Sequence, residues 1–317
     1  MTAYVIVAYP WVTESRAQST YPAKPIRLIV PFPPGGSNDI VGRYIGQKLA
    51  ARLGQPIVID NRAGADAIIG TQLAAGAAAD GYTFLSASIT HTMTPATQKK
   101  LSYDPVRSFT PVALIGTAPV MIATFPPAQI NTLKELIALA KAKPGQIQYA
   151  SSSAGGLTHF AGELFNLMAG VKLAIVPYKG GAPAITDAIA GQVSMTFSNQ
   201  PTALPHVKTG KLRGIAVTSI KRSSAAPELP TIDESGIKGF DVSSWVGVNA
   251  PANLPREIVS RLNAEIVKGM SSPAGRERLN QLAFDPVLST PDQYAAHIKA
   301  EVAKWAQVAK TAGAKLD

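Results

Sequence analysis

Residues 30–39, Val-Pro-Phe-Pro-Pro-Gly-Gly-Ser-Asn-Asp, combine a Pro- and Gly-rich turn with polar side chains in an order that suits anion binding. An apolar run at 26–30 leads into them, and an amphipathic helix pattern leads out. This order directs free backbone N–H groups and the positive end of a helix dipole at whatever lies above the turn. The turn lacks the Gly-Lys-Ser/Thr ending of a nucleotide P-loop and the spacing of a dinucleotide-binding fingerprint. The expected guest is therefore a small carboxylate or oxyanion.

Several side chains of this turn have both a structural and a binding interpretation. Ser37 suits the N-cap of the helix, and Asp39 suits its first turn, where negative charge stabilises the dipole. Facing the ligand, Asp39 would repel an anion, so we expect it to orient the loop or a water molecule. Asn38 could donate a hydrogen bond directly, and Phe32 could cover an apolar part of the ligand or pack beneath the loop. The candidate contacts of this turn are Phe32, Pro33, Pro34, Gly35, Gly36, Ser37, Asn38 and Asp39.

A second Val-Pro-aromatic-Gly-Gly motif occurs at 176–181, again between an apolar run and a helix pattern. Ligands of open α/β sheets bind outside the carboxyl ends of the strands, so two such turns predict two α/β lobes that close on one ligand. The alternative is that each Gly-Gly pair only serves a tight turn. Tyr178 could cover the ligand or pack, and Lys179, the one cation in the motif, could contact the ligand or lie exposed. Tyr178, Lys179 and Gly180 are therefore candidate ligand contacts.

A serine-rich segment at 151–158, Ser-Ser-Ser-Ala-Gly-Gly-Leu-Thr, separates a further strand from a further helix. A plain helix N-cap needs one Ser or Thr, whereas this segment has three serines followed by two glycines. Hydroxyls and free N–H groups together can bind both oxygens of a carboxylate. His159 could either stabilise the turn or approach the ligand. The candidate contacts here are Ser151, Ser153, Gly155, Gly156, Thr158 and His159.

The sequence offers little for metal or covalent chemistry. There are no cysteines, and the four histidines show no His-Glu-x-x-His or His-x-His spacing, so we expect neither a metal nor another cofactor. No Gly-x-Ser-x-Gly elbow occurs. Ser152 and His159 could be a nucleophile and a base, but seven residues apart across a helix start they need not face each other. An enzyme acting on an organic acid, a hydrolase or transferase, stays the alternative to a binding protein.

Composition limits the class of partner. The 317 residues include 30 Lys and Arg and 20 Asp and Glu, a net charge of +10, but the basic residues are scattered and do not alternate with aromatics. A solvated surface with a bias toward anions is therefore expected rather than nucleic-acid binding. No stretch approaches the roughly 18 uninterrupted apolar residues that a spanning helix needs, so no direct membrane insertion is expected.

Residues 1–20 are set apart from the fold. A short apolar stretch precedes Ala17-Gln18-Ser19, which has the small-x-small form of a signal-peptidase site, but a basic segment before it is missing. This pattern predicts an incomplete export signal, with an ordinary disordered tail as the alternative.

Strand and helix patterns alternate along most of the remaining chain. Strands at 26–30, 57–60 and 82–88 with helices at 39–53 and 68–79 predict a βαβαβ unit and a parallel sheet covered by helices. After an apolar segment at 112–124 the pattern restarts, and a helical C-terminus follows a strand at 242–249. The further elements expected are helices at 133–143, 157–169, 182–190, 255–270, 274–283 and 291–312, and strands at 147–150, 173–176, 193–197 and 213–218.

With these motifs in order, the chain resembles the periplasmic solute-binding proteins of the tripartite tricarboxylate transporter family, the TctC or Bug type. The resemblance runs from Tyr21 to near the C-terminus. The motifs that carry it are Tyr21-Pro22 with Pro25-Ile26, Val-Pro-Phe-x-x-Gly-Gly at 30–36, Asp60-Asn61-Arg62-x-Gly64, Asp80-Gly81-Tyr82-Thr83, Val-Pro-Tyr-Lys-Gly at 176–180, Leu-Pro-Thr-Ile-Asp-Glu-Ser-Gly at 229–236, and Trp245 followed by Ala250-Pro251.

The resemblance implies a two-lobed periplasmic-binding-protein fold, the Venus-flytrap, type II-like α/β architecture, with a mainly parallel sheet in each lobe. It also implies two inter-lobe crossings, placed near 118–124 and 239–245. Lobe 1 is then expected at 21–121 plus 243–317, and lobe 2 at 122–242. The implied function is capture of a di- or tricarboxylate or aromatic carboxylate in the periplasm for a membrane permease, and a monomer is expected for a clamp that opens and closes.

By position, the resemblance places ligand loops at 32–39, 86–90, 151–159, 178–181 and 198–200, which adds Ser86, Ser88, Thr90, Ser198 and Asn199 to the candidates. Related proteins that bind amino acids can have an acidic residue after the strand that ends here at Phe197, but this chain has Ser198-Asn199-Gln200. A ligand without an amino group is therefore expected. At Asp66-Ala67-Ile68 the chain departs from the Gly-rich pattern usual in the family, and nothing in the sequence explains the change.

Overall fold

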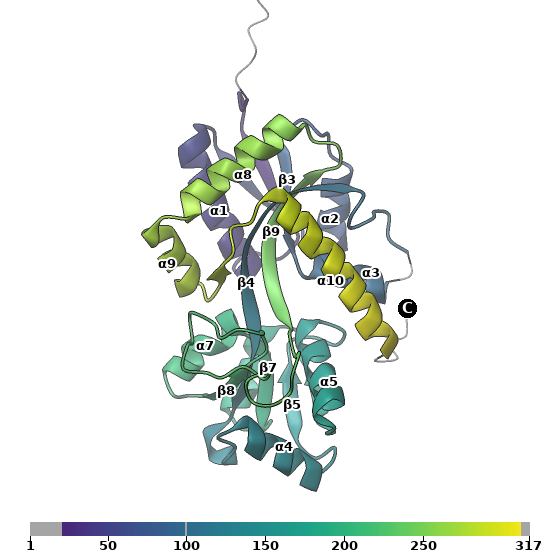
Figure 1. Ribbon diagram of the computed structural model, residues 1–317, viewed down its shortest axis with the longest axis vertical. Coiled ribbons are helices and arrows are strands. Elements are labelled where there is room, and N and C mark those ends of the chain that lie inside the picture. The colour runs from purple at the N-terminus through teal and green to yellow at the C-terminus, as the bar shows by residue number, and fades with distance from the viewer. Residues whose placement is uncertain (1–20, 99, 312–317) are drawn as a thin grey trace, which may run out of the picture.

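The computed structural model describes residues 21–98 and 100–311 and arranges them in an upper and a lower lobe (Figure 1). The upper lobe contains the predicted βαβαβ unit, whose strands pair in parallel in the order β2-β1-β3. Its elements are β1 (Ile26–Val30), α1 (Ser37–Leu53), β2 (Ile57–Asn61), α2 (Ile68–Ala75), β3 (Thr83–Ser88) and α3 (Thr90–Thr97), with α8 (Arg256–Met270), α9 (Pro273–Gln281) and α10 (Pro291–Thr311) added from the C-terminal part.

The lower lobe repeats this architecture around a second set of parallel strands, in the order β7-β5-β6. A short 3-10 helix, Pro126–Ala128, and α4 (Leu133–Ala142) lead into it. The other elements are β5 (Gln148–Ser151), α5 (Leu157–Ala169), β6 (Ala174–Pro177), α6 (Gly181–Ile189), β7 (Met195–Asn199), α7 (Gln200–Lys208) and β8 (Arg213–Val217). The expected two-lobed α/β fold is confirmed, but the sheet is mixed rather than mainly parallel, because the two long strands that join the lobes pair antiparallel with their neighbours.

Two long antiparallel strands, β4 (Phe109–Thr124) and β9 (Ser243–Pro251), join the lobes. Up to Pro119, β4 pairs with β9, and from Val120 it pairs with β7, so the sheet changes lobe at this point. The change falls within the predicted crossing at 118–124, and β9 begins within the predicted crossing at 239–245. The two-residue strand β10 (Asp285–Pro286) also pairs with β4. The limits proposed for the two lobes stay a prediction.

Apolar packing holds each lobe and also spans the junction. In the upper lobe, Ile45 of α1 and Ile266 of α8 belong to one cluster with the buried strands. Another cluster extends from β3 through Trp245 of β9 to Phe197 of β7 in the lower lobe. In Figure 1, α10 runs from the upper lobe toward α5, where Trp305 packs on Phe160 with ring centroids 5.9 Å apart.

Three local expectations differ from the structure. Helix α1 begins at Ser37 with Gly36 as N-cap, so the expected N-cap at Ser37 is wrong. The Gly35 N–H, before the helix, donates a hydrogen bond to Asp39 Oδ2. Helices α3 and α7 were not expected, because α3 is rich in β-branched Thr and contains Pro95, and α7 contains Pro205. Helix α2 ends at Ala75 rather than residue 79.

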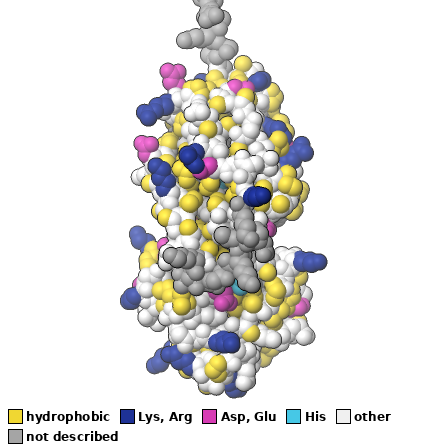
Figure 2. Space-filling view, turned by 90° about the vertical axis from the view of Figure 1, so that its right-hand side faces the viewer, with side chains coloured by type: hydrophobic (Ala, Val, Ile, Leu, Met, Phe, Trp, Pro, Cys, Tyr) yellow, Lys and Arg dark blue, Asp and Glu magenta, His cyan; other side chains and the backbone are white. Residues whose placement is uncertain are grey.

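The basic residues are dispersed over the described surface. On the face in Figure 2, Lys and Arg side chains lie over both lobes rather than in one patch. Among residues 21–98 and 100–311, no helix is long and apolar enough to cross a bilayer. The predicted export signal at residues 1–20, with Ala17-Gln18-Ser19, lies outside the described residues.

Candidate functional site

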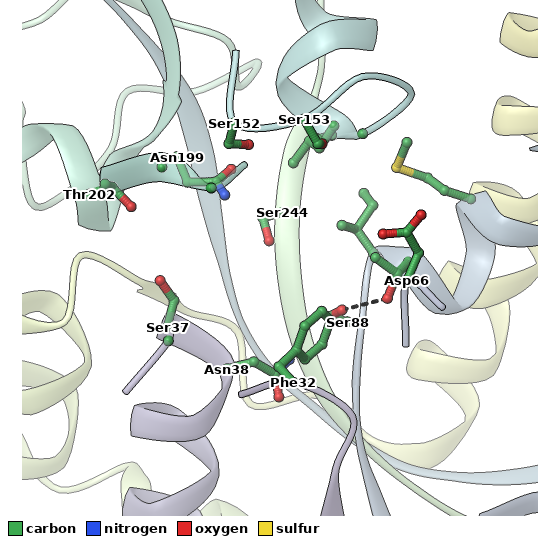
Figure 3. A pocket seen from close by; sticks show the side chains of 18 of the residues that line it. Phe32, Ser37, Asn38, Asp66, Ser88, Ser152, Ser153, Asn199, Thr202 and Ser244 are labelled. Carbon is green, nitrogen blue, oxygen red and sulfur yellow. Dashed lines mark hydrogen bonds between the residues drawn. The ribbon is translucent and has the colours of Figure 1, made fainter. Parts of the chain in front are cut away.

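A cavity of about 670 Å³ opens between the lobes, and both Gly-Gly turns line it (Figure 3). Each turn follows the carboxyl end of a parallel strand, β1 in the upper lobe and β6 in the lower, as the repeated motif predicts. Of the predicted contact residues, the lining includes Phe32, Pro33, Pro34, Gly35, Gly36, Ser37, Asn38, Ser88, Thr90, Ser153, Gly155, Gly156, Gly180, Ser198 and Asn199. Ligand contact by these residues stays a prediction.

Five helices begin at this cavity: α1 and α3 from the upper lobe and α5, α6 and α7 from the lower. None of them has a side chain that caps its first turn by a hydrogen bond. Of the helices that begin away from the cavity, α4 and α9 are capped by Thr132 and Ser272, whereas α8 also lacks a side-chain cap. Uncapped helix N-termini offer N–H donors and positive potential, so their convergence suits an anion.

Asn38 provides a side-chain donor at the same place. Its Oδ1 accepts a hydrogen bond of 2.8 Å from the Ser86 hydroxyl, while its buried Nδ2 has no hydrogen-bond partner. On the other side of the cavity, the buried Oδ1 of Asn199 also lacks a partner. Buried polar atoms in folded proteins are nearly always hydrogen-bonded. Asn38 Nδ2 is a donor and suits a carboxylate, whereas Asn199 Oδ1 is an acceptor and suits only a donor group of a guest. Ser86 itself is fully buried and orients Asn38 from outside the lining.

Asp39 lies outside the cavity lining and holds the first turn in place. Its side chain is 2 % exposed and accepts hydrogen bonds from the Gly35 N–H, Arg43 Nε and Asn61 Nδ2, each 2.9 Å long. Burial opposes ionisation of the carboxyl, but these hydrogen bonds outweigh it and lower the pKa of Asp39. Asp39 is therefore ionised at neutral pH and fixes the loop that presents Gly35 and Asn38.

In the serine-rich segment, some side chains stabilise the turn and others line the cavity. The Thr158 hydroxyl is bonded to the hydroxyls of Ser151 and Ser152 at 2.8 and 2.9 Å and accepts the Ser152 N–H. His159 Nδ1 accepts the Gly155 N–H at 2.8 Å, which requires a neutral ring, and burial lowers the pKa of His159. Three predicted contacts, Ser151, Thr158 and His159, thus lie outside the lining and organise the turn, while Ser152 and Ser153 reach the cavity.

The second Gly-Gly turn contributes backbone rather than its predicted side chains. The Tyr178 hydroxyl donates to Asp187 Oδ2 at 2.8 Å, and burial together with this hydrogen bond raises the pKa of Tyr178 to about 12. Neither Tyr178 nor Lys179 belongs to the lining, whereas Gly180 and Gly181 do. Among the described residues the lining therefore contains no Lys, Arg or His, and neutral groups there would have to hold an anion.

Sequence reasoning missed part of the lining. The residues outside the predicted loops are Asp66, Met93, Thr94, Gln98, Thr202, Ser244, Val246 and Phe284. Asp66 lies in the segment at 66–68 that departs from the family pattern. That departure was the one signal in the sequence that could have indicated Asp66. Ser244 and Val246 come from β9, and apolar Phe284 follows α9, so only the fold brings them here.

The site has a polar and an apolar part. Phe32, Ile89, Met93, Val246 and Phe284 can contact a hydrocarbon stem, while the helix N-termini and hydroxyls can bind a carboxylate. Ser152 Oγ is bonded to Thr158 and His159 Nδ1 to Gly155, so these two are not paired as nucleophile and base. Within the described part of the chain, no group of three or more His, Asp or Glu residues could hold a metal ion.

Comparison with known proteins gives consistent matches over nearly the whole chain. A family model described as tripartite tricarboxylate transporter family receptor matches residues 41–314. Protein BugT of Bordetella pertussis is 38 % identical over 314 residues, which cover 98 % of this chain and 96 % of BugT. A protein from R. palustris, solved with adipate, superposes with a TM-score of 0.83 at 36 % identity, covering 92 % of this chain and 98 % of that one. MatC from Rhodopseudomonas palustris, solved with bound malate, has a TM-score of 0.78 at 30 % identity, covering 91 % and 100 %.

Proposed function

The chain belongs to the tripartite tricarboxylate transporter receptor family, and we propose that it captures a small carboxylic acid between its lobes. The observation that carries this proposal is the convergence of five uncapped helix N-termini and the unpartnered Asn38 Nδ2 on one cavity. Within residues 21–98 and 100–311, no basic side chain lines that cavity. Similar proteins solved with adipate and with malate support a carboxylate as the ligand.

In this proposal the carboxylate binds the turn at the start of α1 together with the turns of the lower lobe. Closure of the lobes removes water, which strengthens the interaction of fixed dipoles with the charge. The ligand shifts the equilibrium toward the closed form by its higher affinity for that form, and the membrane permease of the transporter then recognises the closed form. A dissociation constant of micromolar order corresponds to about −8 kcal/mol.

The proposal includes a location and a partner. Similarity to periplasmic binding proteins supports export of this chain and delivery of the ligand to a membrane permease of the tripartite tricarboxylate transporter type. We further propose that the receptor acts as a monomer, since both walls of the cavity come from one chain. Size-exclusion chromatography with light scattering tests the monomer, and fractionation of cells tests the export.

A screen of di- and tricarboxylates, aromatic acids and amino acids by thermal shift, followed by calorimetry, tests the proposed binding. Recovery of the unchanged acid by NMR after incubation supports a receptor, whereas conversion to a product supports the enzyme alternative. Asn38→Ala should weaken binding about tenfold through loss of a hydrogen bond to a charged group. Asn280→Ala is the matched control, because Asn280 also accepts from a serine hydroxyl, that of Ser224 at 2.8 Å, but does not line the cavity.

A further inference from the structure

Asp66 is the one charged residue among the described residues that line the inter-lobe cavity. The rest of the lining consists of Gly, Pro, Ser, Thr, Asn, Gln and apolar side chains. Within the described ranges, no hydrogen bond or ion pair joins the Asp66 carboxylate to another residue. The negative charge is therefore available to a guest.

The backbone around Asp66 is a fixed turn. Ala65, Asp66 and Ala67 have φ angles of 46°, 49° and 73°, the left-handed region that disfavours L-residues. The Ile68 N–H donates to Ala65 O at 3.0 Å, and Ala67 is buried. A Cβ at Gly70 would lie 2.8 Å from Pro31 Cβ, so the start of α2 packs directly against the end of β1. The turn thus fixes the backbone position of Asp66 despite the strain, and the side chain is exposed and lines the cavity.

Asp66 lies at the opposite side of the cavity from the helix N-termini of α1 and α7. In Figure 3, Ser37 and Thr202 are on one side of the view, and the Asp66 carboxylate is on the other, beyond Ser88. A ligand whose carboxylate binds near Ser37 and Asn38 and which extends across the cavity therefore brings its far end toward Asp66.

We propose that Asp66 selects carboxylic acids that carry a cationic nitrogen at the end remote from the carboxylate. Such a group gains a charge-assisted hydrogen bond or ion pair with Asp66, whereas the second carboxylate of a diacid meets a like charge there. This inference rests on the proposed function and names its ligand class. It differs from the expectation of a ligand without an amino group, which was drawn from Ser198, Asn199 and Gln200 and did not consider Asp66.

Three acids with six carbons each distinguish the effect of the charge at the far end of the ligand from the effect of its hydrocarbon chain. Calorimetry with 6-aminohexanoate, hexanoate and adipate, repeated with the corresponding four-carbon acids, compares a cationic, a neutral and an anionic far end on the full chain. The amino acid should bind the unmodified protein about tenfold more tightly than the diacid. In Asp66→Asn that preference should fall about tenfold, while binding of the neutral acid changes by less than about twofold.

Asp66 also precedes α2, where a negative charge would stabilise the helix dipole without any role in binding. Asp292→Asn is the control, because Asp292 is likewise an acid at the start of a helix, α10, but does not line the cavity. It should leave all affinities unchanged, and thermal melts report whether either variant is folded.

The outcomes are distinguishable. A preference for the diacid in the unmodified protein, or an unchanged preference in Asp66→Asn, overturns the role of Asp66 and leaves the receptor proposal standing. If no acid of the series or of the wider screen binds, the proposed function fails, and the inference about Asp66 fails with it.

Discussion

Asp39→Asn tests whether the first binding turn is held by a buried charge. The substitution keeps the shape of the side chain but removes the charge and replaces one oxygen by an NH₂ group, so either Gly35 N–H and Arg43 Nε at Oδ2 or Asn61 Nδ2 at Oδ1 lose their acceptor. Loss of a hydrogen bond to a charged, buried acceptor corresponds to about 2 kcal/mol of unfolding free energy. The turn would then be ordered only on binding, so carboxylate affinity should also fall several-fold.

The pH dependence of stability gives an independent measurement. The folded-state pKa of Asp39 lies below the usual 3.8, so its stabilisation is fully present above about pH 4 and is lost as the pH falls through the folded-state pKa. Urea unfolding between pH 7 and pH 3 should show a smaller acid-dependent loss of stability in Asp39→Asn than in the unmodified protein.

Arg43→Gln is the control for this experiment. The Arg43 side chain is 53 % exposed, so its ion pair with Asp39 is screened by solvent and its removal should cost less than removal of the charge on Asp39. Equal unfolding midpoints for Asp39→Asn and the unmodified protein, with the same slope below pH 4, would refute the role assigned to this carboxylate.

Three further substitutions probe the other supports of the cavity. Ser86→Ala removes the hydroxyl that orients Asn38 and should weaken carboxylate binding a few-fold in calorimetry, at a cost of about 1 kcal/mol in urea unfolding. Gly180→Ala forces a residue with a Cβ to a φ of 121° and should lower the unfolding free energy by about 1–3 kcal/mol; an unchanged midpoint would contradict the strain. His159 has a folded-state pKa below 6.5, so its bond from the Gly155 N–H persists below pH 6.5 and is lost only as the pH falls through the folded-state pKa. Carboxylate binding should weaken over that acidic range, and His159→Asn, which keeps an acceptor, should flatten that profile.

The alternation of elements could be predicted where the sequence marks their ends. Gly54 ends α1 in a left-handed conformation, and the Thr132 side chain accepts the Glu135 N–H at the start of α4, as the capping pattern indicates. Helices α3 and α7 could not be predicted, because Thr and Pro have low helix propensity and tertiary contacts decide their conformation. Buried Met93 on α3 and Leu204 on α7 show where those contacts are made.

The site was predictable at the carboxyl ends of parallel strands, since both Gly-Gly turns follow such strands and line one cavity. Sequence could not separate the residues that line it from those that support it. Lys179 and His159 carry suitable chemistry, but neither lines the cavity, because Lys179 is exposed and His159 accepts the Gly155 N–H. Val246 lacks any functional signature and lies at the cavity only because β9 passes between the lobes.

The contact between Trp305 and Phe160 limits how far the lobes can separate. Both rings are almost fully buried, and they join helices from different lobes. Each 100 Å² of apolar surface brought into water costs about 2.5 kcal/mol, so a wide opening that parts the rings is unfavourable. The unliganded receptor should therefore open by a twist of strands β4 and β9 that keeps these two rings in contact. The lobes then separate on the side of the cavity away from α10.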